Sequence, residues 1–241
     1  MTIHVYENEQ LLAKAAATIF ASEILKKPDC IIGLATGSTP VPTYQELIRL
    51  NKEGALDFSK VRTFNLDEYV GLAPDHPCSY RRFMNEQLFD HINIDKANTH
   101  VPSGIGDDPE KNAREYDEAI QAAGGVDLQL LGIGHNGHIG FNEPCDRFIA
   151  PTNIVTLTDS TIDANTRFFA KRDDVPRKAI SMGIRTIMSA KRILMICTGE
   201  GKAKAVKEMV TGDIDPRHPA SILQAHHNVQ VLLDKGAASL L

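Results

Sequence analysis

Short apolar runs recur along the chain, and segments with the apolar spacing of amphipathic helices lie between them. The runs are rich in β-branched residues, and the strands that they predict lie at 3–6, 30–35, 61–66, 126–133, 178–184, 192–198 and 229–234. Helices are expected at 8–27, 40–53, 79–92, 108–123, 159–169, 202–211 and 219–226, with Asn8 and Ser79 as N-caps. Because strands that alternate with helices form βαβ units, the pattern predicts one doubly wound α/β domain, 1–241, with a mostly parallel sheet of about seven strands.

The composition allows a sizeable core, because 42% of the 241 residues are hydrophobic. The formal net charge is -5 and no basic stripe is present, which argues against a nucleic-acid partner. The first ten residues lack a signal-peptide pattern and the apolar runs are strand-sized, so we expect a cytoplasmic protein without a membrane segment. The four cysteines are widely separated, which predicts free thiols, with Cys30 and Cys197 in the core.

Chemically rich loops follow four of the predicted strands. Ligands of open parallel sheets bind outside the carboxyl ends of the strands, so these loops are expected to share one edge. They are TGSTP at 36–40, DEY at 67–69, GHNGHIGFNE at 134–143 and GEGK at 199–202.

The stretch GIGHNGHIGFNEP, 132–144, allows several interpretations. It matches the dinucleotide-binding spacing G-x-G-x-x-G, and Asp159 follows at a suitable distance, but Gly140 and Pro144 argue against the helix that this fingerprint needs.

The same stretch could also bind a metal or move protons. His135, His138 and Glu143 are possible metal ligands, although their spacing differs from the helical H-E-x-x-H pattern. Alternatively, His138 and Glu143 form an acid-base pair, in which the carboxylate orients the imidazole. A further alternative is that the histidines only cap or solvate backbone groups. For His135, this role fits the sequence as well as a functional role does.

Two loops have the form of anion sites. In TGSTP, small residues, the hydroxyls of Ser38 and Thr39 and a helix that begins at Pro40 favour an anion, although an ordinary capped turn would look the same. GEGK adds Lys202 in a similar strand-turn-helix setting, but it is not a Walker A loop. Two such sites at one edge suggest a small phosphorylated ligand.

The adjacent carboxylates of NLDEY end a predicted strand. Neighbouring side chains of an extended segment point to opposite sides, so only one of Asp67 and Glu68 is expected to enter the cleft. A carboxylate there could abstract a proton next to a carbonyl group, or it could simply be a solvated strand end.

Taken together, these motifs resemble glucosamine-6-phosphate deaminases, and the resemblance runs from about residue 3 to the C-terminus. It rests on LATGSTP, FNLDEYVGL, LLGIGHNGHIGFNEP, the TRFF segment at 166–169 and TGEGKAKAV. The resemblance implies a Rossmann-like sheet and the conversion of glucosamine 6-phosphate and water into fructose 6-phosphate and ammonium, without a metal or other cofactor.

The resemblance also implies roles for individual residues. Asp67 would move a proton between C2 and C1, His138 would open the sugar ring, and Glu143 would be the partner of His138. Asn136 stands where some family members have aspartate, and it could orient His138 or the substrate without adding charge. The phosphate would be bound by Gly37, Ser38, Thr39, Arg167 and Lys202.

Regulation and assembly are less determined. Asn153 and Val155 align with basic residues of an allosteric site for N-acetylglucosamine 6-phosphate in larger family members, and the chain ends with VLLDKGAASLL. We therefore expect no such activation. The sequence does not distinguish a monomer from a homo-oligomer. Alternative functions are a 6-phosphogluconolactonase, related by fold, and a sugar-phosphate-sensing module, which the missing N-terminal helix-turn-helix segment disfavours.

Overall fold

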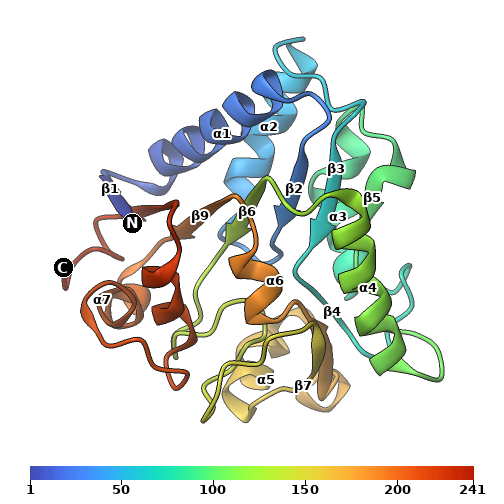
Figure 1. The fold of residues 1–241 in the computed structure, drawn as a ribbon, viewed down its shortest axis with the longest axis vertical. Helices are drawn as coiled ribbons and strands as arrows, with labels where there is room; N and C mark the ends of the chain where they lie inside the picture. Colours follow the sequence, from blue (N-terminus) through green and yellow to red (C-terminus); the bar gives the residue numbers. More distant parts are fainter.

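A seven-stranded parallel sheet forms the centre of the molecule (Figure 1). The computed structural model describes residues 1–241, apart from the side chain of Ala164. The strand order is β1-β10-β9-β6-β2-β3-β5, and every neighbouring pair is parallel. The strands of this main sheet are β1 (Thr2–Tyr6), β2 (Ile31–Leu34), β3 (Arg62–Asn65), β5 (Thr99–His100), β6 (Leu128–Leu131), β9 (Arg192–Cys197) and β10 (Val229–Asp234). The prediction of a mostly parallel sheet of about seven strands is confirmed.

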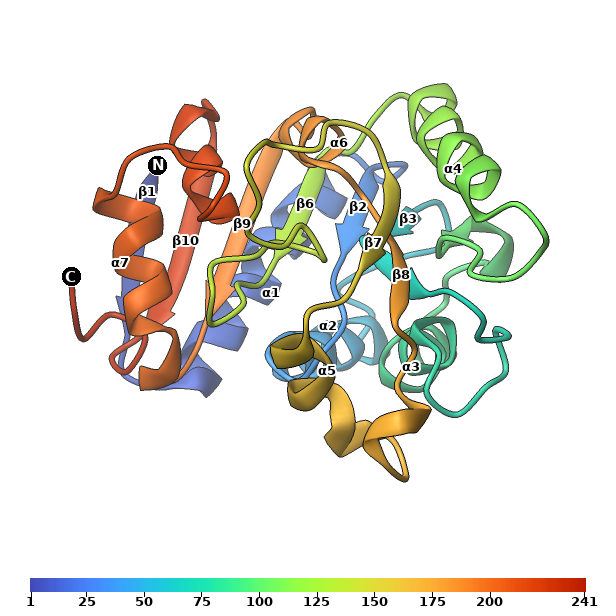
Figure 2. The ribbon, with the colours of Figure 1, turned by 90° about the horizontal axis from the view of Figure 1, so that it is seen from below.

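Helices cover both faces of the main sheet, as a doubly wound fold requires; Figure 2 shows α1 and α2 on one side and α4 and α6 on the other. The α-helices are α1 (Glu9–Lys26), α2 (Val41–Lys52), α3 (Tyr80–Gln87), α4 (Pro109–Ala123), α5 (Asp159–Asn165), α6 (Ile184–Met188) and α7 (Ala203–Thr211). The short 3-10 segments are η1 (Phe89–His91), η2 (Lys96–Asn98), η3 (Thr166–Phe168), η4 (Arg172–Asp174), η5 (Glu200–Lys202) and η6 (Pro219–Ala225).

Local signals explain where several helices begin and end. Asn8 and Ser79 cap α1 and α3 as predicted, since their side chains accept hydrogen bonds from the amides three residues on. The predicted helix 79–92 is too long, because α3 ends before Leu88, whose φ of -145° is not helical. Pro40 lies just before α2 rather than inside its first turn.

The strand predicted at 61–66 belongs to the main sheet as β3, but the strand predicted at 178–184 belongs to another sheet. A second, antiparallel sheet of β4 (Asp67–Tyr69), β8 (Lys178–Ser181) and β7 (Asn153–Thr156) has the order β4-β8-β7. The chain passes from β3 into β4 at Leu66, whose amide bonds to Leu34 of the main sheet and whose carbonyl accepts from Met182 after β8, at 3.0 and 2.8 Å. The continuous βαβ rhythm was therefore the wrong expectation for 178–184, and β7 was not predicted.

The core follows the two sheets. The larger apolar cluster packs the main sheet against its helices and includes Cys30 and Cys197, which are buried as predicted. All four cysteines are free, also as predicted. A smaller cluster lies beside the second sheet: Tyr69, Phe141, Leu157, Ile162, Val175 and Ala179.

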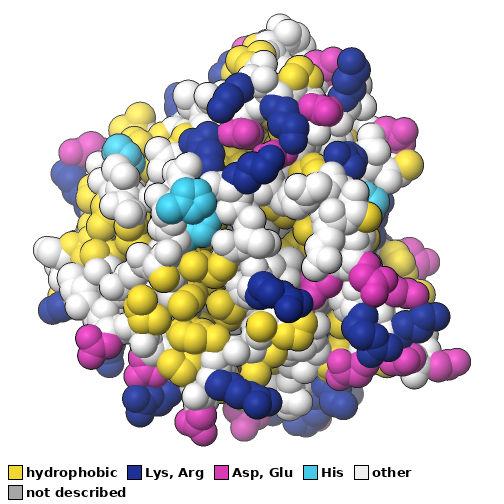
Figure 3. Space-filling model, in the orientation of Figure 1, with side chains coloured by type: hydrophobic (Ala, Val, Ile, Leu, Met, Phe, Trp, Pro, Cys, Tyr) yellow, Lys and Arg dark blue, Asp and Glu magenta, His cyan; other side chains and the backbone are white. Residues whose placement is uncertain are grey.

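On the face shown in Figure 3, Lys and Arg side chains lie among Asp and Glu side chains. None of the described helices combines the length and apolar character needed to cross a membrane.

Candidate active site

A pocket of about 740 Å³ opens at the carboxyl ends of β2, β3, β6 and β9. Its volume is in the range of small-molecule sites. The four loops expected to share one edge of the sheet all contribute to its lining, at 35–40, 66–69, 132–138 and 198–202. That arrangement is the one predicted from the rule that ligands of open parallel sheets bind at the strands' carboxyl ends.

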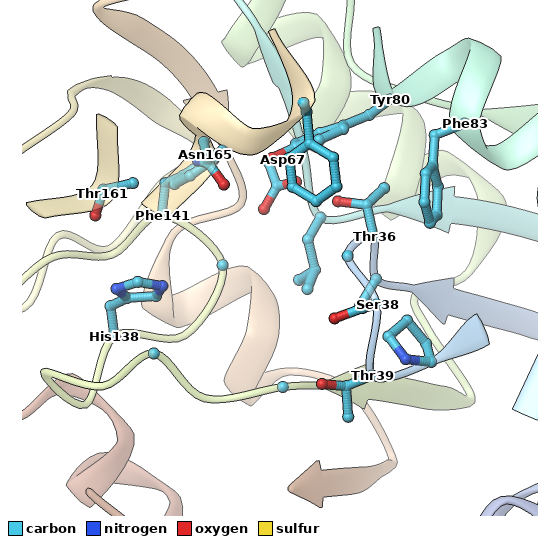
Figure 4. A pocket seen from close by; sticks show the side chains of 18 of the residues that line it. Thr36, Ser38, Thr39, Asp67, Tyr80, Phe83, His138, Phe141, Thr161 and Asn165 are labelled. Atoms are coloured by element: carbon cyan, nitrogen blue, oxygen red, sulfur yellow. The ribbon is translucent and has the colours of Figure 1, made fainter. Parts of the chain in front are cut away.

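Asp67 enters this pocket from the first residue of β4, near the start of α3 (Figure 4). It is buried, and no Lys, Arg or His nitrogen lies within 4.0 Å of its carboxylate among the described residues. Burial, followed by the charge of Glu68, raises the pKa of Asp67 to about 8. The carboxylate therefore exchanges its proton near neutral pH, as a general base must.

Glu68 points away from the pocket, which confirms that only one carboxylate of NLDEY enters it. Gly140, in the stretch GIGHNGHIGFNEP, lies close to Asp67. A methyl group at Gly140 would lie 3.7 Å from Oδ2 of Asp67, and φ of Gly140 is +56°. The amide of Phe141 bonds to Oγ of Ser181, the residue paired with Asp67 across the second sheet.

His138 lies on the opposite side of the pocket from Ser38 and Thr39 (Figure 4), with Glu143 behind it. Nδ1 of His138 is 3.5 Å from Oε2 of Glu143, which is longer than a good hydrogen bond, and this buried nitrogen has no hydrogen-bond partner among the described residues. The pair predicted from the sequence is thus adjacent, with a gap that a small ring movement would close.

Glu143 is well compensated in its buried position. Asn136 donates its side-chain amide to Oε2 at 2.7 Å, and the Thr161 hydroxyl donates to Oε1. Burial raises the pKa of Glu143, but the His138 ring and these two donors lower it by more than that, so the pKa falls from 4.5 to about 2. Glu143 is therefore ionised at neutral pH and can stabilise an imidazolium at His138.

Asn136 hydrogen-bonds to the backbone of His138. Its Oδ1 accepts from the amide of His138 at 3.3 Å, and its side-chain amide goes to Glu143. The sequence predicted that this amide could orient His138, and the structure places the link on the backbone and the carboxylate rather than on the imidazole ring.

The glycines that imitate a dinucleotide fingerprint make room for side chains. A methyl group at Gly134 would lie 2.3 Å from the His138 ring, and one at Gly137 would lie 2.4 Å from the His218 ring. No helix lies between β6 and β7 in the described backbone, so the helix required by the fingerprint is absent.

Cationic side chains also line the pocket. Lys202, just before α7, and Arg167, in η3, both line it, and neither has a carboxylate within 4.0 Å among the residues that the structure describes. Burial and the charge of Arg167 lower the pKa of Lys202. The charge of Lys202, then burial, lowers the pKa of His135. Such crowding of positive groups is relieved when an anion binds.

The start of α2 adds neutral donors to the pocket. Gly37, Ser38 and Thr39 line it, and φ of Gly37 is +94°, a conformation that glycine adopts without strain. No side chain caps α2, so the capped turn considered from the sequence is not observed. The Val41 amide bonds to the Ser38 carbonyl and Pro42 has no N–H, so the positive end of the helix dipole and the hydroxyls of Ser38 and Thr39 are what the start of α2 offers to an anion.

The sequence did not predict that aromatic side chains form part of the pocket wall. The pocket is also lined by Tyr69, Tyr80, Phe83, Phe141, Phe168 and Phe169. The Tyr80 and Phe141 rings are stacked, with centroids 6.2 Å apart and an interplanar angle of 13°. Their apolar runs read equally well as core, so no local signal separated them from it. Across the described residues, no group of three or more His, Cys, Asp or Glu side chains is arranged to hold a metal ion.

The chain is similar to known proteins over nearly all of its length. Residues 7–232 match the family described as glucosamine-6-phosphate isomerases/6-phosphogluconolactonase, and the chain belongs to this family. It is 52% identical to a glucosamine-6-phosphate deaminase of Halothermothrix orenii and 54% identical to one of Clostridium perfringens, each over the full length of both chains.

Solved structures agree. A monomeric glucosamine-6-phosphate deaminase, described as a missing link of the NagB superfamily, superposes with a TM-score of 0.98 at 46% identity and 100% coverage of both chains. A 6-phosphogluconolactonase of Trypanosoma brucei has a TM-score of 0.74 at 22% identity and covers 100% of this chain and 98% of its own. The latter similarity concerns the fold alone.

Proposed function

We propose that this chain converts glucosamine 6-phosphate and water into fructose 6-phosphate and ammonium, with no metal or other cofactor. The observation that carries the proposal is that one pocket holds a buried carboxylate, Asp67, a His138–Glu143 pair and a cationic end. The names of the relatives that match over the full length of the chain support the same reaction.

The substrate's phosphate is held at the cationic end of the pocket. Lys202 and Arg167 supply charge, and the guanidinium can bind phosphate oxygens in a bidentate manner. The loop of Gly37, Ser38 and Thr39 supplies hydroxyl and backbone donors at the start of α2. Fixing the phosphate places the sugar ring between Asp67 and His138.

Ring opening is assigned to the His138–Glu143 pair. An imidazole ring can both donate and accept a proton, so His138 can move a proton between the C1 hydroxyl and the ring oxygen. The ionised Glu143 favours the protonated imidazole that forms in this step. Asn136 keeps Glu143 in place with a neutral hydrogen bond.

Proton transfer between C2 and C1 is assigned to Asp67. The carboxylate removes the C2 proton of the open aldehyde while the aldehyde oxygen takes a proton from the C2 ammonium group, which gives an enolamine, and the proton held by Asp67 then returns at C1. The resulting imine carbon at C2 takes up water and releases ammonium. A C2 ammonium group near the buried carboxylate lowers the pKa of Asp67, so substrate binding favours the basic form.

The direct test measures ammonium and fructose 6-phosphate released by the purified protein from glucosamine 6-phosphate. We expect Asp67→Asn to abolish turnover and to leave binding of the sugar phosphate largely intact. Full activity of Asp67→Asn would refute the assignment of the base. Hydrolysis of 6-phosphogluconolactone without ammonium release would instead identify a lactonase, and binding without either product would indicate a sensor.

A second test addresses ring opening and regulation. His138→Gln is expected to slow turnover of the cyclic sugar much more than turnover of substrate supplied in its open-chain form, and equal losses would remove the ring-opening role. Asn153 and Val155 lie on β7. We expect a hyperbolic rate curve that N-acetylglucosamine 6-phosphate does not change.

A further inference from the structure

The buried carboxylate of Glu68, which faces away from the pocket, binds the first turn of α3. Its Oε1 accepts from the amides of Tyr69 and Tyr80 at 2.8 and 3.0 Å, and its Oε2 accepts from the amide of Arg81 at 2.9 Å. Tyr80 and Arg81 are the first two residues of α3. The amide of the third, Arg82, bonds to Oγ of Ser79 at 3.1 Å. All three first-turn amides of α3 are therefore satisfied, two of them by Glu68.

The geometry favours the ionised form of Glu68. The residue is 3% exposed, and no Lys, Arg or His nitrogen lies within 4.0 Å of it in the described structure. Burial raises the pKa of Glu68, while the three amide donors oppose that rise. Both oxygens face N–H donors, and the positive end of the α3 dipole points at them, so an added proton would replace an attraction with a repulsion.

Glu68 thereby links two parts of the pocket wall. Tyr80, which it holds at the start of α3, lines the pocket, and its hydroxyl donates to that of Tyr69 at 3.2 Å. Asp67 precedes Glu68 in β4 and lies on the other side of the strand, inside the pocket near Tyr80 (Figure 4).

We propose that Glu68 is a positioning residue for the reaction: its carboxylate holds Tyr80 in the wall beside Asp67, and its negative charge keeps Asp67 a strong base. The inference rests on the proposed function, in which Asp67 moves the substrate proton. Burial raises the pKa of Asp67 first and the charge of Glu68 raises it further.

Other titratable and charged groups face Asp67 from each neighbouring element. Tyr69 belongs to the same strand, Tyr80 to α3 and Tyr116 to α4, and burial raises the pKa of each phenol, so all three are neutral near pH 7. Across the pocket lie His138, His135, Lys202 and Arg167, which favour the ionised form of Asp67 when they are charged. Glu68 is thus the neighbouring anion that opposes ionisation of Asp67.

The test compares Glu68→Gln with Ser79→Ala. The glutamine has nearly the same size but no charge, and it can replace only one of the two accepting oxygens. Ser79→Ala weakens the same helix start at the adjacent amide but leaves the charge of Glu68 in place. The measurements are the pH dependence of kcat/KM for glucosamine 6-phosphate and the titration of the Asp67 carboxyl carbon by 13C NMR, assigned with Asp67→Asn.

For Glu68→Gln we expect the acidic limb of kcat/KM to move down by on the order of one pH unit, and kcat to fall on the plateau. The substrate's own ionisation is the same for all variants, so it cannot produce this difference. Ser79→Ala is expected to unfold at a lower temperature with an unchanged acidic limb. An unchanged limb in Glu68→Gln, or an equal shift in Ser79→Ala, overturns the proposal.

Two further results keep the inference separate from the proposed function. If the wild-type protein releases no ammonium, the proposed function fails, while the NMR titration still reports whether Glu68 raises the proton affinity of Asp67. If Glu68→Gln does not fold, Glu68→Asp keeps the charge and shortens the reach. It is then expected to keep the wild-type acidic limb with a lower kcat, and the reverse pattern refutes the proposal.

Discussion

The buried carboxylate of Asp67 makes the pocket a source of instability at alkaline pH. The pKa of Asp67 is raised from 3.8 to about 8 in the folded protein. Because the folded state binds this proton more tightly than the unfolded state, the stabilising effect of protonation is complete below about pH 4 and is lost as pH rises through about 8. Asp67→Asn cannot ionise, so it escapes this loss.

The size of the effect follows from the pKa difference. A pKa raised from 3.8 to about 8 corresponds to roughly 6 kcal/mol of folding free energy when Asp67 is fully ionised. At pH 5 the unfolded chain is ionised but the folded carboxyl is not, and the cost is only about 2 kcal/mol. Between pH 5 and pH 9 the advantage of Asp67→Asn over wild type should therefore grow by on the order of 4 kcal/mol.

Urea denaturation at pH 5, 7 and 9 measures this growth directly, with the free energy of unfolding extrapolated to water for each variant. Asp75→Asn serves as the control, because Asp75 is an exposed carboxylate in the loop before α3 and should change stability little at any pH. An Asp67→Asn protein that is less stable than wild type at pH 9, or an advantage that does not change with pH, refutes the reasoning.

Three further predictions concern the loop, the phosphate and metals. Gly134→Ala should lower kcat about 100-fold by displacing the His138 ring, whereas Gly132→Ala, whose methyl group meets nothing within 4 Å, should fold and leave that ring in place; similar kcat losses in both would contradict this. Lys202→Met should raise KM for glucosamine 6-phosphate about 10-fold or more with a smaller effect on kcat, and a loss confined to kcat would argue against phosphate binding. Prolonged treatment with EDTA should leave the rate unchanged, and an activity restored only by a divalent metal would revive a metal site.

Buried strands of the main sheet could be predicted because both of their faces are covered. The runs that became β2, β6 and β9 are apolar apart from Gln129 in β6 and Arg192 at the start of β9, and their length separates them from helices. Since parallel strands point their carboxyl ends to one edge, the shared location of the four functional loops followed as well.

The second sheet could not be predicted, because strand partners depend on contacts distant in sequence. The KAIS run that became β8 reads alike whether its neighbour is parallel or antiparallel. Leu66, where the chain changes sheets, lies between Asn65 and Asp67 in a segment without Gly or Pro that would mark the change. Side-chain pairing was equally hidden: nothing local indicated that Asn136 bonds to Glu143, or that Glu68 holds α3.

The exchange of sheets at Leu66 has a consequence for the order in which the protein assembles. Asp67 pairs with Ser181, and Leu66 bonds to Met182, so these contacts join segments more than 110 residues apart. While the chain emerges from the ribosome, β2 and β3 can pair early, but Asp67 lacks its antiparallel neighbour until β8 has been synthesised. The reactive carboxylate consequently reaches its buried setting only in the second half of synthesis, and a nascent chain that stops before that point exposes it to water.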